Sequence, residues 1–322
     1  MKFVVRTVGC ILLSGTLLTS AASAAPAWPS AKPITLVVPY PPGGNADILG
    51  RLFAQQLSQK TGQTVVVDNK PGAGSMVGSY QVVRAGSDGY TFLLGSIANV
   101  LNQYFYKKPL YDMNKDLVPV SQLVNVPNYV AVGPTEKFRT MGEIITFAKA
   151  NPKKLSCANT GVGTSTYLSC EMIKTMTGAE LVNVPYKGGA AAMQDVMGGQ
   201  ANMVIANEAL VPINDKRLIG IAVTSAKRSP LAPQLPPLSD TLPGFDVNSW
   251  YGVFAPVGVA KEILDQVVEA AAAMAKEEAT LSRLKVIGAT PVGSSQKDFA
   301  AFFKDEMAKW GEVTKKMNVQ LD

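Results

Sequence analysis

Two glycine-rich loops contain the residues of this chain that are best suited to chemistry. The first is Pro39–Asp47 (PYPPGGNAD), which follows the apolar run Ile34–Val38, and the second is Asn159–Thr166 (NTGVGTST), which follows the strand-like run 155–158. A helix-forming stretch comes after each loop, so each presents backbone N–H groups at a helix N-terminus, where an anion binds favourably. The pair predicts a site that grips a small acid from two sides.

The donors of this site can be assigned to the two loops. We expect a carboxylate to accept N–H bonds from the first loop, and a second acidic group to be held by the second loop, where hydroxyl groups add donors. The predicted contacts are Gly43, Gly44 and Asn45 on one side and Gly163, Thr164 and Ser165 on the other. Asp47 is predicted to be structural, because it favours the positive helix end and can hold the Pro-Gly-Gly turn through backbone bonds.

A third turn, Tyr186–Gly189, follows the predicted strand 181–184. In open α/β sheets, ligands bind at the carboxyl ends of the strands, and all three turns occupy that position. Lys187 in this turn either attracts the acid or is simply solvated, and the sequence leaves both alternatives open.

The chain lacks histidine, which restricts its catalytic options. A Ser-His-Asp or Cys-His set is excluded, and the usual general base near neutral pH is missing. Ser294–Lys297 matches a Ser-x-x-Lys pattern, although a helix-capping serine explains it more simply. Gly72–Gly78 misses the dinucleotide spacing Gly-x-Gly-x-x-Gly by one residue and is predicted to be a tight strand-to-helix turn. We therefore expect no enzyme and no cofactor, with a secreted histidine-free serine hydrolase as the alternative.

The first residues have the pattern of a secretory signal. Lys2 and Arg6 precede the apolar stretch 8–18, and the small residues 22–24 provide a cleavage site. Residues 1–24 are thus predicted to be a signal peptide cleaved near Ala24, and the protein to be periplasmic. The formal net charge of +6 includes no basic run longer than two residues, which argues against nucleic acid as a partner.

Cys157 and Cys170 remain after the predicted cleavage. In an oxidising compartment they either form a disulfide between a strand and the helix that returns beside it, or stay as buried thiols; both alternatives are open. Two thiols without histidine make a poor zinc site, so no metal is expected.

Strand-like and helix-like segments alternate along the rest of the chain. Continuous apolar strands separated by helices predict parallel, doubly wound sheets that are covered on both faces. The predicted strands are 34–38, 64–67, 90–94, 155–158, 181–184, 203–206, 220–224 and 250–255. We expect two lobes joined by crossing strands: lobe 1 from residues 25–123 and 225–322, and lobe 2 from residues 124–224.

With these segments in place, the chain resembles the substrate-binding receptors of tripartite tricarboxylate transporters, the Bug family. The resemblance covers the whole mature chain and rests on an ordered set of motifs: Ile34–Asp47, Val66–Gly74, Val184–Gly189, Gly198–Gln200, Ala222–Ser229 and Trp250–Pro256. It implies a two-lobe periplasmic binding protein fold (type II-like) with the ligand cleft between the lobes. It also implies a receptor that delivers a carboxylate to the integral-membrane permease subunits of a transporter.

The resemblance also implies site residues. Similar receptors bind a carboxylate through the loop that matches Pro39–Asp47, which includes Tyr40, and the loop that matches Gly161–Ser165 grips the other end. Family pockets draw in addition on the positions of Ser96, Tyr186 and Asn207. Where relatives often have histidine, this chain has Tyr167, which faces either the pocket or the core.

The identity of the carboxylate is the least determined feature. Tyr40, Tyr186, Trp250 and Tyr167 could flank a ring while the two helix ends each take a carboxylate, so an aromatic diacid such as terephthalate is the first choice. With no acidic residue aimed clearly at the pocket, an amine-bearing ligand is less favoured. We expect a monomer.

Overall fold

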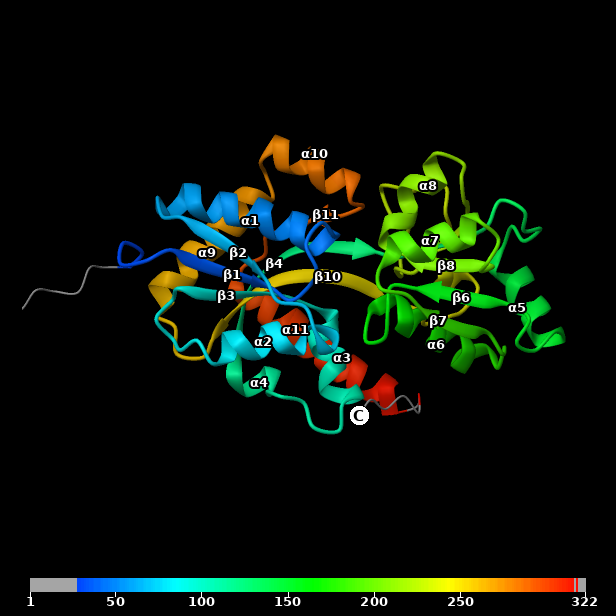
Figure 1. The fold of residues 1–322 in the computed structure, drawn as a ribbon, viewed down its shortest axis with the longest axis horizontal. Helices are drawn as coiled ribbons and strands as arrows, with labels where there is room; N and C mark the ends of the chain where they lie inside the picture. The colour runs from blue at the N-terminus through cyan, green and yellow to red at the C-terminus, as the bar shows by residue number, and fades with distance from the viewer. Residues whose placement is uncertain (1–27, 316, 318–322) are drawn as a thin grey trace, which may run out of the picture.

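The computed structural model describes residues 28–315 and 317, and in it the chain forms two lobes side by side (Figure 1). The predicted signal peptide lies outside the described residues. Within these ranges, no helix combines the length and the apolar character needed to cross a bilayer.

The sheet of the first lobe has six strands in the order β11-β4-β10-β3-β1-β2. Their bounds are β1 (Ile34–Val38), β2 (Val65–Asn69), β3 (Thr91–Ser96), β4 (Leu117–Pro127), β10 (Asn248–Pro256) and β11 (Thr290–Pro291). β1 pairs in parallel with β2 and β3, whereas β10 is antiparallel to β3 and β4. The prediction of a purely parallel sheet is wrong here, because β10 brings the chain back from the second lobe and runs opposite to the outgoing β4.

The sheet of the second lobe has five strands in the order β7-β6-β8-β5-β9. Their bounds are β5 (Tyr129–Val132), β6 (Ser156–Asn159), β7 (Val182–Pro185), β8 (Met203–Ala206) and β9 (Ile219–Val223). β6 is parallel to β7 and β8, whereas β5 is antiparallel to β8 and β9. The cause is the same as in the first lobe, since β5 enters from the other lobe.

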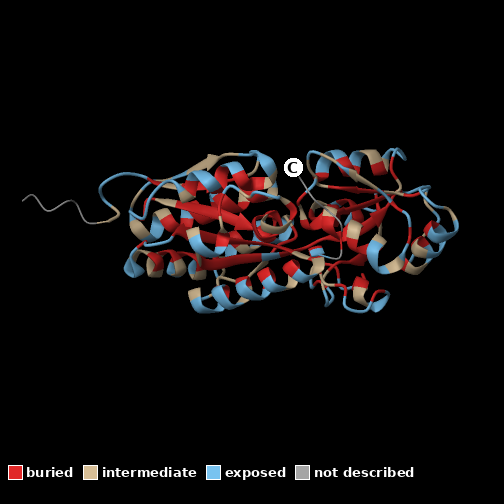
Figure 2. Ribbon diagram, turned by 90° about the horizontal axis from the view of Figure 1, so that it is seen from below, coloured by how far each residue is buried: buried red, intermediate tan, exposed pale blue. Residues whose placement is uncertain are grey.

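Helices cover both faces of the first sheet. They are α1 (Asn45–Thr61), α2 (Met76–Val83), α3 (Ile97–Phe105), α4 (Met113–Asp116), α9 (Lys261–Met274), α10 (Glu278–Val286) and α11 (Gln296–Lys315), with a short 3₁₀ turn η1 (Ala73–Ser75) before α2. Helices α1 and α9 share one apolar core with the sheet, and α2, α3 and α11 contribute to another. Figure 2 shows the buried sheets between helices whose outer faces are exposed.

The second lobe repeats this layering. Its helices are α5 (Met141–Ala150), α6 (Ser165–Thr177), α7 (Gly189–Met197) and α8 (Leu210–Asn214), with η2 (Asn207–Ala209) before α8. Residues of α6 pack into one core and residues of α7 and α8 into another. The two glycine-rich loops and the third turn therefore come directly before α1, α6 and α7.

The segment between β9 and β10 runs back along the second lobe before it crosses. The N–H of Val223 donates to Pro236 O (2.9 Å), and Ala232 and Leu235 share an apolar core with Leu218. This segment contains the 3₁₀ turn η3 (Leu238–Asp240). The exact residues at which the lobes divide stay a prediction.

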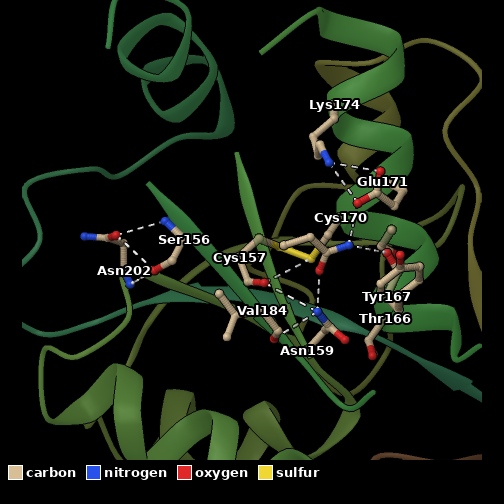
Figure 3. Close-up of a disulfide and its surroundings, with 12 residues drawn as sticks. Ser156, Cys157, Asn159, Thr166, Tyr167, Cys170, Glu171, Lys174, Val184 and Asn202 are labelled. Carbon is tan, nitrogen blue, oxygen red and sulfur yellow. Dashed lines mark hydrogen bonds and ion pairs between the residues drawn. A yellow bond between two sulfur atoms is a disulfide. The ribbon is translucent and has the colours of Figure 1, made fainter. Parts of the chain in front are cut away.

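Cys157 of β6 and Cys170 of α6 form a disulfide, which settles the alternative between a bridge and two thiols (Figure 3). Both residues are fully buried. The bridge ties the strand that leads into the second loop to the helix that leaves it.

Replacing both cysteines with alanine is expected to lower the free energy of unfolding by about 3 kcal/mol, because the unfolded chain regains the entropy of a short closed loop. For a chain of this size the loss corresponds to a decrease of roughly 5–10 °C in the melting temperature. Calorimetry of the wild type and the double variant, each with and without reductant, measures it. Equal melting temperatures for the oxidised wild type and the variant would refute a stabilising role.

Candidate ligand-binding site

Asp47 holds the first loop in place. Its carboxylate accepts hydrogen bonds from the N–H of Gly43 (3.0 Å) and from Asn69 Nδ2 (3.0 Å), and it forms an ion pair with Arg51 (3.0 Å). Burial alone would raise the pKa of Asp47, but hydrogen bonds from Arg51, Gly43 and Asn69 outweigh it and keep the pKa below its ordinary value. The predicted structural role of Asp47 is confirmed.

Helix α1 begins without a side-chain cap. Gly44 is the N-cap residue in an extended conformation. Within the described chain, the N–H groups of Gly44 and Asn45 have no acceptor, whereas the N–H of Gly43 is taken by Asp47. The side-chain nitrogen of Asn45 is also buried without a partner there. Two of the three predicted backbone donors are therefore available to an anion.

Tyr40 stands beside this loop, directly after β1. Its hydroxyl lies 2.5 Å from Ser96 Oγ, and its ring makes an edge contact with Tyr251, with ring centroids 6.2 Å apart. Burial raises the pKa of Tyr40 to about 12, so the phenol stays neutral. Ser96 also caps α3 by accepting a hydrogen bond from the N–H of Ala98 (3.1 Å). The Ser96 hydroxyl is thus engaged by protein groups.

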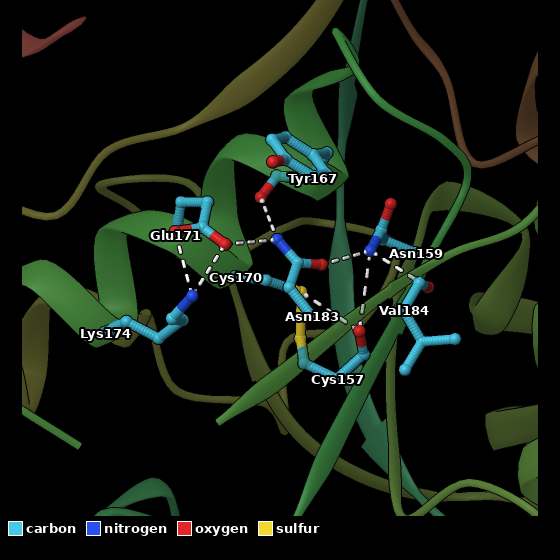
Figure 4. Close-up of polar contacts among 8 residues, drawn as sticks. All are labelled: Cys157, Asn159, Tyr167, Cys170, Glu171, Lys174, Asn183 and Val184. Atoms are coloured by element: carbon cyan, nitrogen blue, oxygen red, sulfur yellow. Dashed lines mark hydrogen bonds and ion pairs between the residues drawn. A yellow bond between two sulfur atoms is a disulfide. The ribbon is translucent and has the colours of Figure 1, made fainter. Parts of the chain in front are cut away.

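Asn159, the last residue of β6, holds the second loop. Figure 4 shows its contacts with Asn183 and Val184. Its Oδ1 accepts from the N–H of Gly161 (3.0 Å), and its Nδ2 donates to Asn183 Oδ1 (2.5 Å) and Val184 O (3.1 Å). The conformation of Gly161, with φ +122°, is one that side chains rarely permit. The strand end therefore fixes how the loop enters α6.

Thr164 closes the second loop. Its hydroxyl donates to Gly161 O (2.6 Å) and accepts from the N–H of Tyr167 (3.2 Å), so it caps its own helix. In the part of the chain that the structure describes, the N–H groups of Gly163 and Ser165 have no acceptor. The backbone of this loop, more than its hydroxyls, is free to bind an anion.

Gly163 brings the second loop against the first lobe. It has φ +81°, and a Cβ at this position would lie 3.3 Å from Asn102 Oδ1 on α3. Asn102 donates to Gly74 O, while its Oδ1 is buried without a hydrogen-bond partner among the described residues. The two lobes therefore meet at Gly163 and Asn102.

Asn128 links the second loop to the crossing strands. It lies between β4 and β5, and its Oδ1 accepts from Asn207 Nδ2 (2.7 Å) and from Ser165 Oγ (3.2 Å). Its backbone O accepts from the N–H of Thr224 (3.0 Å), which precedes the returning segment. The predicted site residues Ser165 and Asn207 thus share one buried partner at the hinge.

The third turn contains two predicted residues, and a residue that the sequence analysis missed lies against it at Gly189. The Tyr186 hydroxyl donates to Asp195 Oδ2 (2.7 Å), and Lys187 is exposed, which fits the solvated alternative. The missed residue is Glu208, directly after Asn207. Its position after a predicted strand, at the same sheet edge as the second loop, was the available signal.

Each predicted contact lies at or just after the carboxyl end of a strand. The structure brings Tyr40, Gly43, Gly44, Asn45, Ser96, Gly163, Thr164, Ser165, Tyr186 and Asn207 to the ends of β1, β3, β6, β7 and β8. These residues differ in how available their polar groups are to a ligand. Several side chains already form hydrogen bonds within the protein, whereas N–H groups at the helix starts have no acceptor among the described residues. Besides Glu208, the sequence analysis missed Asn102, Asn128 and Tyr251.

Trp250 is not part of this site. It is fully buried, packs edge-on against Phe299 and Phe302, and donates from Nε1 to Glu306 Oε2 (2.8 Å). Side chains alternate along β10, so Tyr251 takes the position beside Tyr40. Tyr167 is half-buried, and burial and Glu171 raise its pKa; whether it faces a ligand stays a prediction.

The Ser-x-x-Lys pattern has a structural explanation. Ser294 Oγ accepts from the N–H of Gln122 (2.9 Å), which joins it to β4. Ser295 Oγ accepts from the N–H of Asp298 (3.1 Å) at the start of α11. The capping serine is thus Ser295, the neighbour of the serine in the pattern.

Residues 49–319 match the family described as the tripartite tricarboxylate transporter family receptor. The chain belongs to this receptor family. The resemblance inferred from the motifs is confirmed, and so is the expectation of a binding protein rather than an enzyme.

Individual relatives agree over nearly the full length. The chain is 31% identical to Protein BugT of Bordetella pertussis (strain Tohama I) over 316 residues, covering 95% of this chain and 97% of BugT. The solved structure of R. palustris Rpa4515 with adipate has a TM-score of 0.83 and 33% identity, covering 91% of this chain and 99% of that one. Periplasmic binding protein BugD has a TM-score of 0.80 and 32% identity, covering 90% and 98%. The two-lobe fold predicted from the sequence is confirmed.

Proposed function

We propose that this receptor captures a dicarboxylate between its lobes in the periplasm and delivers it to the permease of a tripartite tricarboxylate-type transporter. One observation carries the proposal: among the described residues, N–H groups at a helix start in each lobe have no acceptor, at Gly44 and Asn45 of α1 and at Gly163 and Ser165 of α6. Such groups bind carboxylates strongly, because the helix dipole adds to the hydrogen bonds.

The finer form of the proposal is an aromatic diacid such as terephthalate. Tyr40 and Tyr251 support it, since their rings lie together beside the first loop and stay uncharged. A straight-chain diacid is the other form, and it is supported by the adipate in the related structure of Rpa4515. In both forms one carboxylate lies at each helix start.

The proposed mechanism is closure about the hinge. Ligand bound to both loops stabilises the arrangement in which Gly163 meets Asn102, and the permease recognises this closed form. Asn128 would transmit the closure, because it joins Ser165 and Asn207 to the crossing strands. The proposal includes three further points: residues 1–24 are a cleaved signal peptide, the receptor is a monomer, and its partner is the integral-membrane permease of the transporter.

A thermal-shift screen of the mature chain, residues 25–322, tests the function. The panel contains adipate, terephthalate and the matched monoacids hexanoate and benzoate, after unfolding and refolding to remove any bound ligand. A diacid is expected to stabilise the protein by about 2.7 kcal/mol at 100 times its Kd, and the monoacids by much less. No shift with any diacid would contradict the proposal. Labelling by a serine probe, or ligand converted to product, would favour the hydrolase.

A further inference from the structure

Glu208, the residue after Asn207 at the junction of the lobes, is half-buried. Its carboxyl carbon lies 2.7 Å from the point that a Cβ on Gly189 would occupy, so the carboxyl group covers the start of α7. Its Oε2 is buried and has no hydrogen-bond partner among the described residues. A buried carboxylate oxygen without a partner is costly, so its presence requires an explanation.

Among the described residues, the elements that pack against Glu208 contribute no cation, and Lys187 in the turn before α7 is exposed. The turn η2, which contains Glu208, packs against α7, α8, β5 and β8, and none of these elements contains lysine or arginine. Their titratable side chains are Asp195, which is bonded to Tyr186, and Tyr129, which is bonded to Ser229. Tyr251 of β10 is also near, since burial, Tyr40 and Glu208 all raise its pKa. The setting disfavours negative charge on Glu208.

Two effects oppose each other at this carboxyl group. The uncapped start of α7 favours the charged form, whereas burial favours the neutral form. The net effect is that burial raises the pKa of Glu208 above its ordinary value. A neutral carboxylic acid is a hydrogen-bond donor, and proteins use such acids to bind anionic oxygens.

We propose that Glu208 binds the ligand as a neutral acid, whose O–H donates to a carboxylate oxygen of the dicarboxylate. The inference rests on the proposed function and deepens it: the receptor binds the dianion with Glu208 protonated, and takes up a proton from solvent at any pH where Glu208 is ionised in the free receptor. Two charged carboxylates cannot share a buried contact at low cost, and the proton removes that repulsion.

Titration calorimetry of the wild type with adipate and with terephthalate, between pH 6 and pH 9, tests the inference. Both ligands are predominantly dianions in this range, so most of the pH dependence reports the protein. The affinity is expected to fall as the pH rises through the pKa of Glu208, by up to about tenfold per pH unit. Buffers of different ionisation enthalpy are expected to reveal proton uptake on binding.

The variant Glu208→Gln separates this role from a structural one. Its amide N–H replaces the acid O–H, so its affinity near pH 6 is expected to stay within about threefold of the wild type and to be independent of pH. The matched control Glu180→Gln removes an exposed carboxylate that lies 3.8 Å from Lys153 and is expected to keep the wild-type pH profile.

Three results would overturn the inference. Diacid binding by the wild type that is tight and independent of pH, without proton uptake, would contradict the role of Glu208 while leaving the proposed function intact. Tighter binding of 2-aminoadipate than of adipate, lost in Glu208→Gln, would show that a charged Glu208 pairs with an ammonium group. No diacid binding by either protein at pH 6 would contradict the proposed function itself.

Discussion

The variant Gly163→Val is expected to bind the diacid at least 100-fold more weakly than the wild type. Gly163 has φ +81°, which valine adopts only at a cost, and a Cβ there would lie 3.3 Å from Asn102 Oδ1. The larger side chain would hold the lobes apart and displace the loop whose N–H groups are proposed to bind the ligand. Titration calorimetry measures the loss.

Gly178→Val is the matched control for this variant. Gly178 ends the same helix, α6, with φ +70°, but a Cβ there would have no heavy atom within 4 Å. Both variants are expected to lose about 1–2 kcal/mol of stability from backbone strain, whereas only Gly163→Val loses binding. Equal affinities in the two variants would show that the contact between the lobes is irrelevant to ligand binding.

The variant Asn128→Ala is expected to lower the free energy of unfolding by about 2–3 kcal/mol and the affinity by tenfold or more. The side chain is fully buried and accepts hydrogen bonds from Asn207 and Ser165, so its removal leaves Ser165 Oγ without that acceptor. The start of α6 would lose its link to the crossing strands. Urea unfolding and titration calorimetry measure the two effects.

Asn125→Ala, three residues earlier in the chain, provides the comparison. Asn125 is exposed on β4, and its Oδ1 accepts only from Gln122 Nε2 (2.6 Å) among the described residues. Its replacement is expected to change stability by less than about 0.5 kcal/mol and to leave binding unchanged. If Asn128→Ala kept the wild-type affinity, the link from hinge to loop would have no role in binding.

The sequence predicted eight of the described strands, because their apolar runs are short and bounded by turn residues, but it did not predict β4, β5 and β11. Strands 34–38 and 203–206 coincide with β1 and β8. The antiparallel pairing of β10 was missed, because apolar patterning does not encode strand direction. The direction follows from the path of the chain between the lobes.

The parts of the candidate site that consist of backbone N–H groups could be predicted from the sequence. Glycine and proline at strand ends identify both loops, and Asp47 has a local role that spacing reveals. Asn128, Asn102 and Glu208 are different, because each acts on residues far away in the sequence. Trp250 and Tyr251 were confused for a related reason: only the register of β10 decides which ring faces Tyr40.

A crystal structure of the mature receptor with the diacid selected by the screen tests the central claim most directly. It is expected to place one carboxylate within hydrogen-bond distance, about 2.7–3.2 Å, of the N–H groups of Gly44 and Asn45. The other carboxylate is expected at the N–H groups of Gly163 and Ser165, between closed lobes. A diacid bound outside this junction, or held by one lobe with the other loop empty, would contradict the account.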